Sequence, residues 1–166
     1  MDQLIMSAGY TEPLIKIYAD GACRGNPGPG GWGVVLLTAD GEQELMGATG
    51  NTTNNRMELC GVLEGLRALP EPVRVRVYTD STYVCKGMTE WIAGWKRRNW
   101  RTSGGRTVKN QDLWLALDEA QSRHEVEWQW IRGHAGNVGN ERADGLANAA
   151  IDRWLANGAT DSGCGP

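Results

Sequence analysis

The sequence lacks the features of a membrane-spanning or exported protein. Its 166 residues contain no apolar run of the roughly 18 residues that a membrane span requires. The first residues, MDQLIMSAGYTE, have neither the basic start nor the apolar stretch of a signal peptide. Internal repeats, low-complexity tracts and linkers are also absent. We therefore expect a cytoplasmic protein with a single domain over 1–166, a core over about 14–156, and flexible ends at 1–12 and 158–166.

The four cysteines form no metal-binding or redox motif. None are spaced as CxxC, and the two histidines, His124 and His134, do not lie at zinc-ligand spacing from them. Thiols stay reduced in the cytoplasm. We therefore expect free thiols at Cys23, Cys60, Cys85 and Cys164.

The sequence also has no overall excess of basic residues. Taken alone, this argues against a nucleic-acid-binding protein. The net charge is −3. However, residues 95–109 (WKRRNWRTSGGRTVK) carry six positive charges and no acid, so the remainder of the chain carries −9. A local basic patch on an acidic body is compatible with a site for a polyanion.

The pattern of apolar residues predicts a meander of three strands, followed by helices and strands that alternate. The expected strands cover 14–20, 31–39, 42–50, 73–80 and 125–131. The expected helices cover 55–69, 81–88, 90–98, 111–123 and 140–156. This order indicates an α/β fold, a five-stranded mixed sheet with an antiparallel edge, a parallel centre and helices on both faces. A right-handed crossover would place strand 73–80 parallel to strand 14–20.

Two of these strands end in an aspartate. Strand 14–20 ends in YAD and strand 73–80 ends in YTD, so Asp20 and Asp80 would project at the same edge of the sheet. Open α/β sheets place their sites at the carboxyl ends of strands. The glycines that follow Asp20 leave the backbone free to approach a ligand closely.

Two further acids lie on the apolar stripes of helices. Glu58, in the first turn of the helix expected over 55–69, shares a face with Val62 and Leu66. Asp144 lies on the stripe of the last helix, seven residues before Ile151. The positive end of a helix dipole would favour either acid without any site, so that explanation stays open for both.

Four carboxylates brought together would repel one another and hold their protons. Divalent cations remove this penalty. Oxygen ligands without a Cys or His cluster favour Mg²⁺ or Mn²⁺ over zinc. Two such ions can activate water and stabilise the leaving oxygen in phosphodiester cleavage.

Five motifs in this order resemble those of the bacterial type 1 ribonuclease H family, which cuts the RNA strand of RNA–DNA hybrids. The motifs are DGACRGNPGPGG (20–31), TTNNRMEL (52–59), YTDSTYV (78–84), WIAGWKRRNW (91–100) and GHAGNVGNERAD (133–144). The resemblance covers nearly the whole chain, from about Leu14 to Trp154. It implies a five-stranded mixed sheet with helices on both sides, in agreement with the pattern of apolar residues.

The resemblance also implies the roles of the acids. Asp20, Glu58, Asp80 and Asp144 match the four residues that bind two Mg²⁺ ions, for which Mn²⁺ can substitute. Asp20 would bridge both ions, Asp80 and Asp144 would hold the ion that activates water, and Glu58 the ion near the leaving group. Hydrolysis would leave a 3′-hydroxyl and a 5′-phosphate.

The two histidines receive different expectations. His134 matches the mobile histidine of the family, which transfers a proton or assists product release; a solvent-facing loop histidine is the alternative. His124 matches no functional position, and we expect it at the surface.

The resemblance implies two groups of residues that contact the hybrid. Amides near a minor groove can read the 2′-hydroxyls that distinguish RNA from DNA. The first group comprises Asn26, Thr53, Asn54 and Asn55, of which Thr53 or Asn54 is also expected to cap the helix. The second is a basic protrusion that meets phosphates of the DNA strand, with Trp91, Trp95, Lys96, Arg97, Arg98, Trp100 and Arg101.

The sequence departs from the family at two substrate positions. Thr82 stands where close relatives have Gln, and Asn51 where some have a phosphate-binding Arg, so these two contacts are in doubt. Neither departure affects the four acids.

Three other functions are weighed against the enzyme. A non-catalytic module that binds hybrids or duplexes would be expected to have lost one of the four acids. Another nuclease of the same fold, such as a resolvase or transposase core, would not be expected to carry TTNNRMEL and the basic tryptophan-rich loop. A plain α/β binding protein accounts for each residue singly but not for the acids together with the loop. A monomer is the default expectation.

Overall fold

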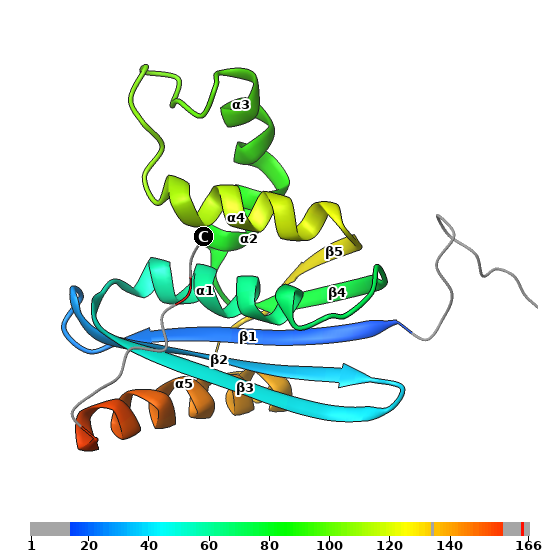
Figure 1. The fold of residues 1–166 in the computed structure, drawn as a ribbon, viewed down its shortest axis with the longest axis vertical. Helices are drawn as coiled ribbons and strands as arrows, with labels where there is room; N and C mark the ends of the chain where they lie inside the picture. Colours follow the sequence, from blue (N-terminus) through cyan, green and yellow to red (C-terminus); the bar gives the residue numbers. More distant parts are fainter. Residues whose placement is uncertain (1–13, 134, 158–163, 165–166) are drawn as a thin grey trace, which may run out of the picture.

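The centre of the protein is a five-stranded sheet of strand order β3-β2-β1-β4-β5 (Figure 1). The structure is a computed structural model that describes residues 14–133, 135–157 and 164. The strands are β1 (Ile15–Cys23), β2 (Gly28–Thr38), β3 (Gly41–Thr52), β4 (Arg74–Thr79) and β5 (Glu125–Trp130). β1 to β3 form an antiparallel meander, and β4 is parallel to both β1 and β5. The predicted α/β fold with a mixed sheet is confirmed.

Helices cover both faces of the sheet, as predicted. They are α1 (Asn54–Arg67), α2 (Thr82–Lys86), the π-helical turn η1 (Gly87–Trp91), α3 (Ile92–Arg97), α4 (Gln111–Ser122) and α5 (Val138–Ala156). α1 packs on β1 and β2 with α4 against it, and α5 crosses the opposite face over β1, β2 and β3 (Figure 1). Within the described part of the chain, none of the helices has the length and apolar character needed to cross a membrane.

The main core lies between α1 and the sheet. The apolar stripe of α1 is fully buried and packs on the β1 side chains that alternate toward it, Ile17 and Ala19. Full burial of one such side chain contributes about 1.5–3 kcal/mol to stability. Thr53 begins the helix because its side chain accepts a hydrogen bond from the Arg56 N–H, 3.3 Å, which confirms the predicted cap.

β1 is longer than the sequence predicts. It continues through Asp20 to Cys23 because its last residues pair with β2, Gly21 with Trp32 and Cys23 with Gly30. The prediction that the strand ends at Asp20 is therefore wrong. Glycines favour this arrangement because they leave room for α5. Its backbone lies so close to Gly31 that an added Cβ would be 2.5 Å from the Ala147 oxygen.

The segment 81–98 is continuous rather than two separate short helices. α2 passes directly into η1 and then into α3. At Gly87 the chain lies directly against the ring of Trp114, where an added Cβ would overlap the indole. This contact has no local signature in the sequence, which explains why the helical boundaries predicted there are wrong.

His124 is buried, not at the surface as expected. Only 8% of the residue is exposed, and its Nδ1 accepts a hydrogen bond from the Val73 N–H, 3.2 Å. Burial lowers the pKa of His124, and the nearby charge of Arg123 lowers the pKa further. The neutral imidazole therefore joins the end of α4 to the start of β4.

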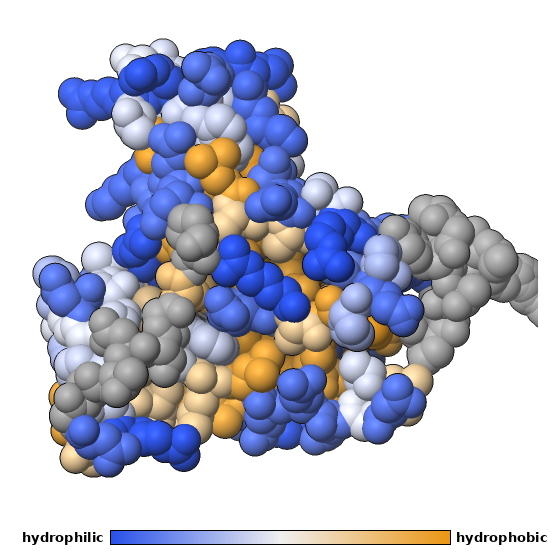
Figure 2. All heavy atoms as spheres, viewed as in Figure 1, coloured by the Kyte–Doolittle hydropathy of each residue, from blue (hydrophilic) through white to orange (hydrophobic). Residues whose placement is uncertain are grey.

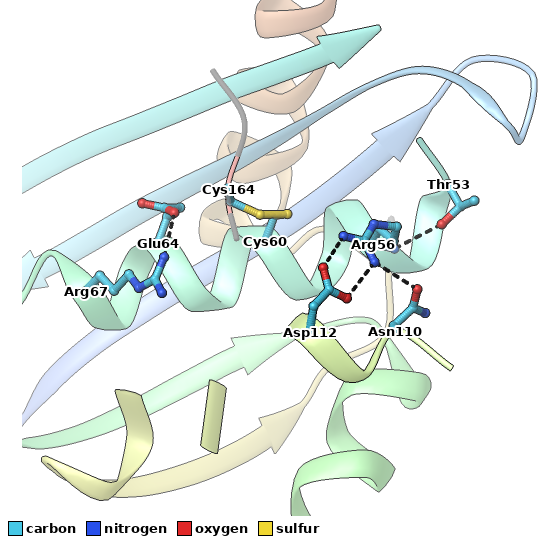
Figure 3. Close-up of a disulfide and its surroundings, with 8 residues drawn as sticks. All are labelled: Thr53, Arg56, Cys60, Glu64, Arg67, Asn110, Asp112 and Cys164. Carbon is cyan, nitrogen blue, oxygen red and sulfur yellow. Dashed lines mark hydrogen bonds and ion pairs between the residues drawn. A yellow bond between two sulfur atoms is a disulfide. The ribbon is translucent and has the colours of Figure 1, made fainter. Parts of the chain in front are cut away.

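The expectation of four free thiols is wrong for two of them. Cys60 on α1 and Cys164 form a disulfide with a Cα–Cα distance of 5.7 Å (Figure 3). Cys164 packs against the same core cluster that contains Cys60, which brings the two sulfur atoms together. Cys23 and Cys85 are free. A pairing across 104 residues cannot be inferred from cysteine spacing.

Replacing Cys164 with Ser should lower the free energy of unfolding by about 2–4 kcal/mol, because a disulfide that closes a long loop restricts the unfolded chain. Chemical denaturation with and without dithiothreitol measures this: the reductant should destabilise the wild type to the level of the variant and leave the variant unchanged. Cys85→Ser is the matched control. Because Cys85 is a free thiol, this variant should respond to the reductant as the wild type does. Equal stability of the oxidised and reduced wild type would contradict the prediction.

Candidate active site

Three carboxylates meet where β1 and β4 lie side by side. Oxygens of Asp20, Glu58 and Asp80 all lie within 4.8 Å of one another. They come from β1, from α1 and from the residue that follows β4. This is the edge at which open α/β sheets place their sites.

The parallel register of β1 and β4 places two of these acids at equal depth. The paired residues end at Tyr18 and Tyr78, whose rings stack with centroids 4.4 Å apart. Asp20 and Asp80 each lie two residues beyond this pair. The common edge predicted for them is therefore observed, although β1 itself continues past Asp20.

The third acid depends on a close approach of α1 to β1. A Cβ on Gly21 would lie 2.5 Å from the backbone nitrogen of Glu58 and 2.5 Å from the carbonyl carbon of Met57. Only glycine permits this separation. The glycine after Asp20 was expected to allow close approach of a ligand, and at Gly21 it allows close approach of helix α1. Because α1 begins at Asn54, Glu58 is its fifth residue, not a residue of its first turn as predicted.

The cluster is buried and electrostatically unfavourable when all its acids are ionised. Asp20 is 4% exposed and Glu58 6%. Burial raises the pKa of Asp20 to about 8, with repulsion from Asp80 as the second cause. Burial, followed by repulsion from Asp20 and Asp80, raises the pKa of Glu58 well above its usual value.

The donor set fits a divalent cation. Glu58 Oε1 is buried and has no hydrogen-bond partner within the described structure. An unpartnered buried oxygen beside two further carboxylates offers the oxygen ligands that Mg²⁺ and Mn²⁺ prefer. A cation would also relieve the repulsion that raises the pKa of Asp20 and Glu58.

The fourth predicted acid adjoins the cluster from the opposite face. Asp144 lies half-buried on α5, outside the three-residue group, and its charge contributes to the raised pKa of Asp20. Asn148 Nδ2 donates to the Asp144 backbone oxygen, 3.0 Å. His134 lies outside the described residues, so its role stays a prediction.

The predicted amide group lies at the start of α1, the helix that carries Glu58. Asn26 Oδ1 accepts a hydrogen bond from the Asn54 N–H, 2.9 Å, which links the β1–β2 loop to the helix. Asn54 and Asn55 are exposed, whereas the Thr53 hydroxyl is committed to its cap. These residues are brought together; their contact with nucleic acid stays a prediction.

The predicted tryptophans form one aromatic cluster. Trp95 lies between Trp91, Trp100 and Trp114, with ring centroids 5.9, 6.3 and 5.2 Å away. Trp95 and Trp100 pack against the core, so they support the protrusion whatever else they contact. Trp91, the last residue of η1, and Trp95 on α3 are four residues apart, and their rings lie against each other.

The basic residues lie on a protrusion, formed by α3 and the segment to α4, that stands away from the sheet (Figure 1). Its surface is mainly hydrophilic in the view of Figure 2. Lys96 forms an ion pair with Asp118, 3.1 Å, whereas Arg98 Nε donates to the Arg101 backbone oxygen, 3.2 Å. Arg97 and Arg98 also line a groove of about 430 Å³.

Two features of the site were missed by the sequence analysis. Arg56 binds Asp112 through both carboxylate oxygens, 3.0 and 2.7 Å, and also Asn110, 3.2 Å, so the start of α1 is tied to α4 (Figure 3). Trp130 donates its indole N–H to the backbone oxygen of Asp80, 3.0 Å. The only sequence signals were an arginine two residues before Glu58 and a tryptophan at the end of a predicted strand.

The fold and the site together define a class: an α/β protein with a buried carboxylate cluster suited to divalent cations at the sheet edge. Comparison with known proteins identifies the family within this class. The sequence model of the RNase H family matches residues 12–152. The chain belongs to the RNase H family.

Curated relatives named Ribonuclease H support this assignment. One from Methylobacillus flagellatus is 61% identical over 142 residues, which is 86% of this chain and 94% of the relative. One from Bordetella bronchiseptica is 59% identical over 138 residues, 83% of this chain and 89% of the relative.

Solved structures agree. LC9-RNase H1, a type 1 RNase H with the type 2 active-site motif, is 39% identical with a TM-score of 0.76, over 93% of this chain and 77% of that chain. LC11-RNase H1 in complex with an RNA/DNA hybrid is 25% identical with a TM-score of 0.64, over 85% of this chain and 99% of that chain.

Gly21→Ala should separate α1 from β1 and so move Glu58 away from Asp20. We expect the free energy of unfolding to fall by about 1–3 kcal/mol, as for other overpacked sites. We also expect Mg²⁺ affinity to fall at least about tenfold. Calorimetric Mg²⁺ titration and chemical denaturation measure the two effects. In Gly145→Ala, the control on α5, the new methyl group meets no described atom within 4 Å beyond its chain neighbours and the nearby backbone of α5, so Mg²⁺ affinity should be retained. Equal affinity in both variants would refute the role of the close approach.

Asp20→Asn should stabilise the metal-free protein at high pH. The folded-state pKa of Asp20, about 8, exceeds the unfolded value of about 3.9, so the stability linked to its protonated form is present below pH 4 and lost as pH rises through 8. The asparagine does not ionise. At pH 9 the free energy of unfolding of the variant should therefore exceed that of the wild type by at least about 1 kcal/mol, since one pKa unit corresponds to about 1.4 kcal/mol.

Denaturation in EDTA at pH 5, 7 and 9 tests this expectation. The stability difference between Asp20→Asn and wild type should grow with pH. A difference that is the same at all three pH values would show that Asp20 ionises normally.

Proposed function

We propose that this chain hydrolyses the RNA strand of RNA–DNA hybrids and leaves 5′-phosphate and 3′-hydroxyl ends. The observation that carries the proposal is the group of buried Asp20 and Glu58 with partly buried Asp80, whose oxygens lie within 4.8 Å at the sheet edge of a chain in the RNase H family. Relatives named Ribonuclease H that share about 60% of their residues with it support the same activity.

The four acids would hold two Mg²⁺ ions, or Mn²⁺ in their place. Asp20 suits the shared position, because Asp80 and Asp144 both raise its pKa and it in turn raises that of Glu58. When bound, such ions activate water and stabilise the leaving oxygen. The protein's own contribution is to hold the carboxylates in a buried, fixed array, and His134 would move a proton.

The hybrid would extend from the exposed amides at the start of α1 to the basic protrusion. Asn26, Asn54 and Asn55 meet at the start of α1, the helix that carries Glu58, and would recognise 2′-hydroxyls of the RNA strand. Arg97, Arg98 and Arg101 are exposed on the protrusion and would meet phosphates of the DNA strand, with Lys96 held near Asp118. The complex of LC11-RNase H1 with an RNA/DNA hybrid supports this class of substrate.

Cleavage of an end-labelled RNA–DNA hybrid in millimolar Mg²⁺ tests the proposal. We expect cuts in the RNA strand alone. No cuts are expected in EDTA, which removes the cation, or with Asp20→Asn, which removes a carboxylate that would bind it. Duplex DNA and duplex RNA of the same sequence are the substrate controls. Binding of the hybrid without cleavage in Mg²⁺ or Mn²⁺ would instead indicate a non-catalytic binding module.

Arg97→Ala should weaken binding of the hybrid about equally for all sequences. Loss of one phosphate contact lowers the slope of log affinity against log salt by about 0.9, because fewer counterions are released. Fluorescence anisotropy with the Asp20→Asn protein at several salt concentrations measures the slope. Arg153→Ala is the matched control, since Arg153 is also exposed but lies near the end of α5. An unchanged slope in Arg97→Ala would exclude the contact.

A further inference from the structure

Asp80 is the acid of the cluster with the least support from regular structure. β4 ends at Thr79, and the ladder between β4 and β5 ends with the pair Thr79 and Trp130. The next backbone hydrogen bond, from the Ile131 N–H to the Thr79 oxygen, 2.9 Å, does not reach Asp80. The Asp80 carbonyl therefore lies beyond the end of this ladder.

A side chain takes the place of a strand partner there. The indole N–H of Trp130 donates to the Asp80 carbonyl oxygen at 3.0 Å. Trp130 is 44% exposed, one of the few large apolar residues so exposed among those the structure describes. Core packing does not account for a tryptophan in that position. A directed hydrogen bond to the backbone of a cluster acid does account for it.

The chain that follows Trp130 also limits the Asp80 side chain. A Cβ on Gly133 would lie 2.5 Å from Asp80 Oδ2 and 3.2 Å from Asp80 Cγ. The end of β5 thus fixes the carbonyl of Asp80 through Trp130, and the segment after it lies against the Asp80 carboxylate through Gly133. These two contacts limit how far Asp80 can move relative to Asp20 and Glu58, its neighbours in the cluster.

We propose that Trp130 is a positioning residue of the metal site, which holds Asp80 in place by its hydrogen bond to the Asp80 backbone. The inference rests on the proposed function, since it assigns Asp80 to the divalent cation. Residues that orient metal ligands in this way typically change metal affinity or activity by 10–100-fold when they are replaced. Contact of Trp130 with the substrate is not required.

The same strand provides a matched control. Trp128 lies two residues earlier on the same face of β5, and its indole N–H donates to Gln121 Oε1 on α4, 3.2 Å. Trp128→Phe and Trp130→Phe therefore remove the same kind of donor from the same strand. Only Trp130→Phe releases a residue of the carboxylate cluster.

The experiment titrates full-length wild type, Trp128→Phe and Trp130→Phe with Mg²⁺ alone by calorimetry, and measures kcat and KM on the hybrid. Trp130→Phe should bind Mg²⁺ about tenfold more weakly and lose kcat with KM unchanged, while Trp128→Phe keeps wild-type values. Equal Mg²⁺ affinity in the two variants, or no Mg²⁺ binding by the wild type, would overturn the inference. If the wild type binds Mg²⁺ but does not cleave the hybrid, the proposed function fails, while weaker Mg²⁺ binding by Trp130→Phe alone still supports the role of Trp130.

Discussion

The close contact between α1 and β1 at Gly21 determines whether the carboxylate cluster can form. It brings the backbone of Glu58 against a strand that already carries Asp20, and the parallel neighbour β4 adds Asp80. The buried stripe of α1 and the bond from Arg56 to Asp112 hold the helix in this position. The core and the site are therefore formed together, since the packing that buries α1 also assembles the carboxylates.

This assembly opposes folding electrostatically. Buried carboxylates repel one another and lose hydration, so the pKa of Asp20 rises to about 8 and that of Glu58 rises well above its usual value. A divalent cation at the cluster would offset the repulsion, so metal binding and folding stability would be coupled through the same groups.

The sequence patterns predicted features that depend on neighbouring residues in the chain. Features that depend on tertiary contacts were not predicted. The Thr53 cap and the buried face of Glu58 follow from helix chemistry and period, and the parallel placement of β4 beside β1 follows from crossover handedness. The burial of His124 and the disulfide at Cys164 depend on segments distant in sequence, which no local pattern encodes. The bond from Trp130 to Asp80 was missed for the same reason, because it requires the register of β4 and β5.

The fold thus holds Asp20 in a buried carboxylate cluster, and a divalent cation would relieve the repulsion within it. Carbon-13 NMR of the side-chain carboxylates, titrated from acid to alkaline pH without metal and then with Mg²⁺, follows both effects at the residue concerned. We expect Asp20 to titrate near pH 8 in the metal-free protein, and Mg²⁺ to shift this titration to lower pH. An Asp20 carboxylate that titrates near its ordinary pKa of about 3.9, with no response to Mg²⁺, would contradict the account. It would show that burial and repulsion do not raise the pKa of Asp20 and that the cluster does not bind the metal.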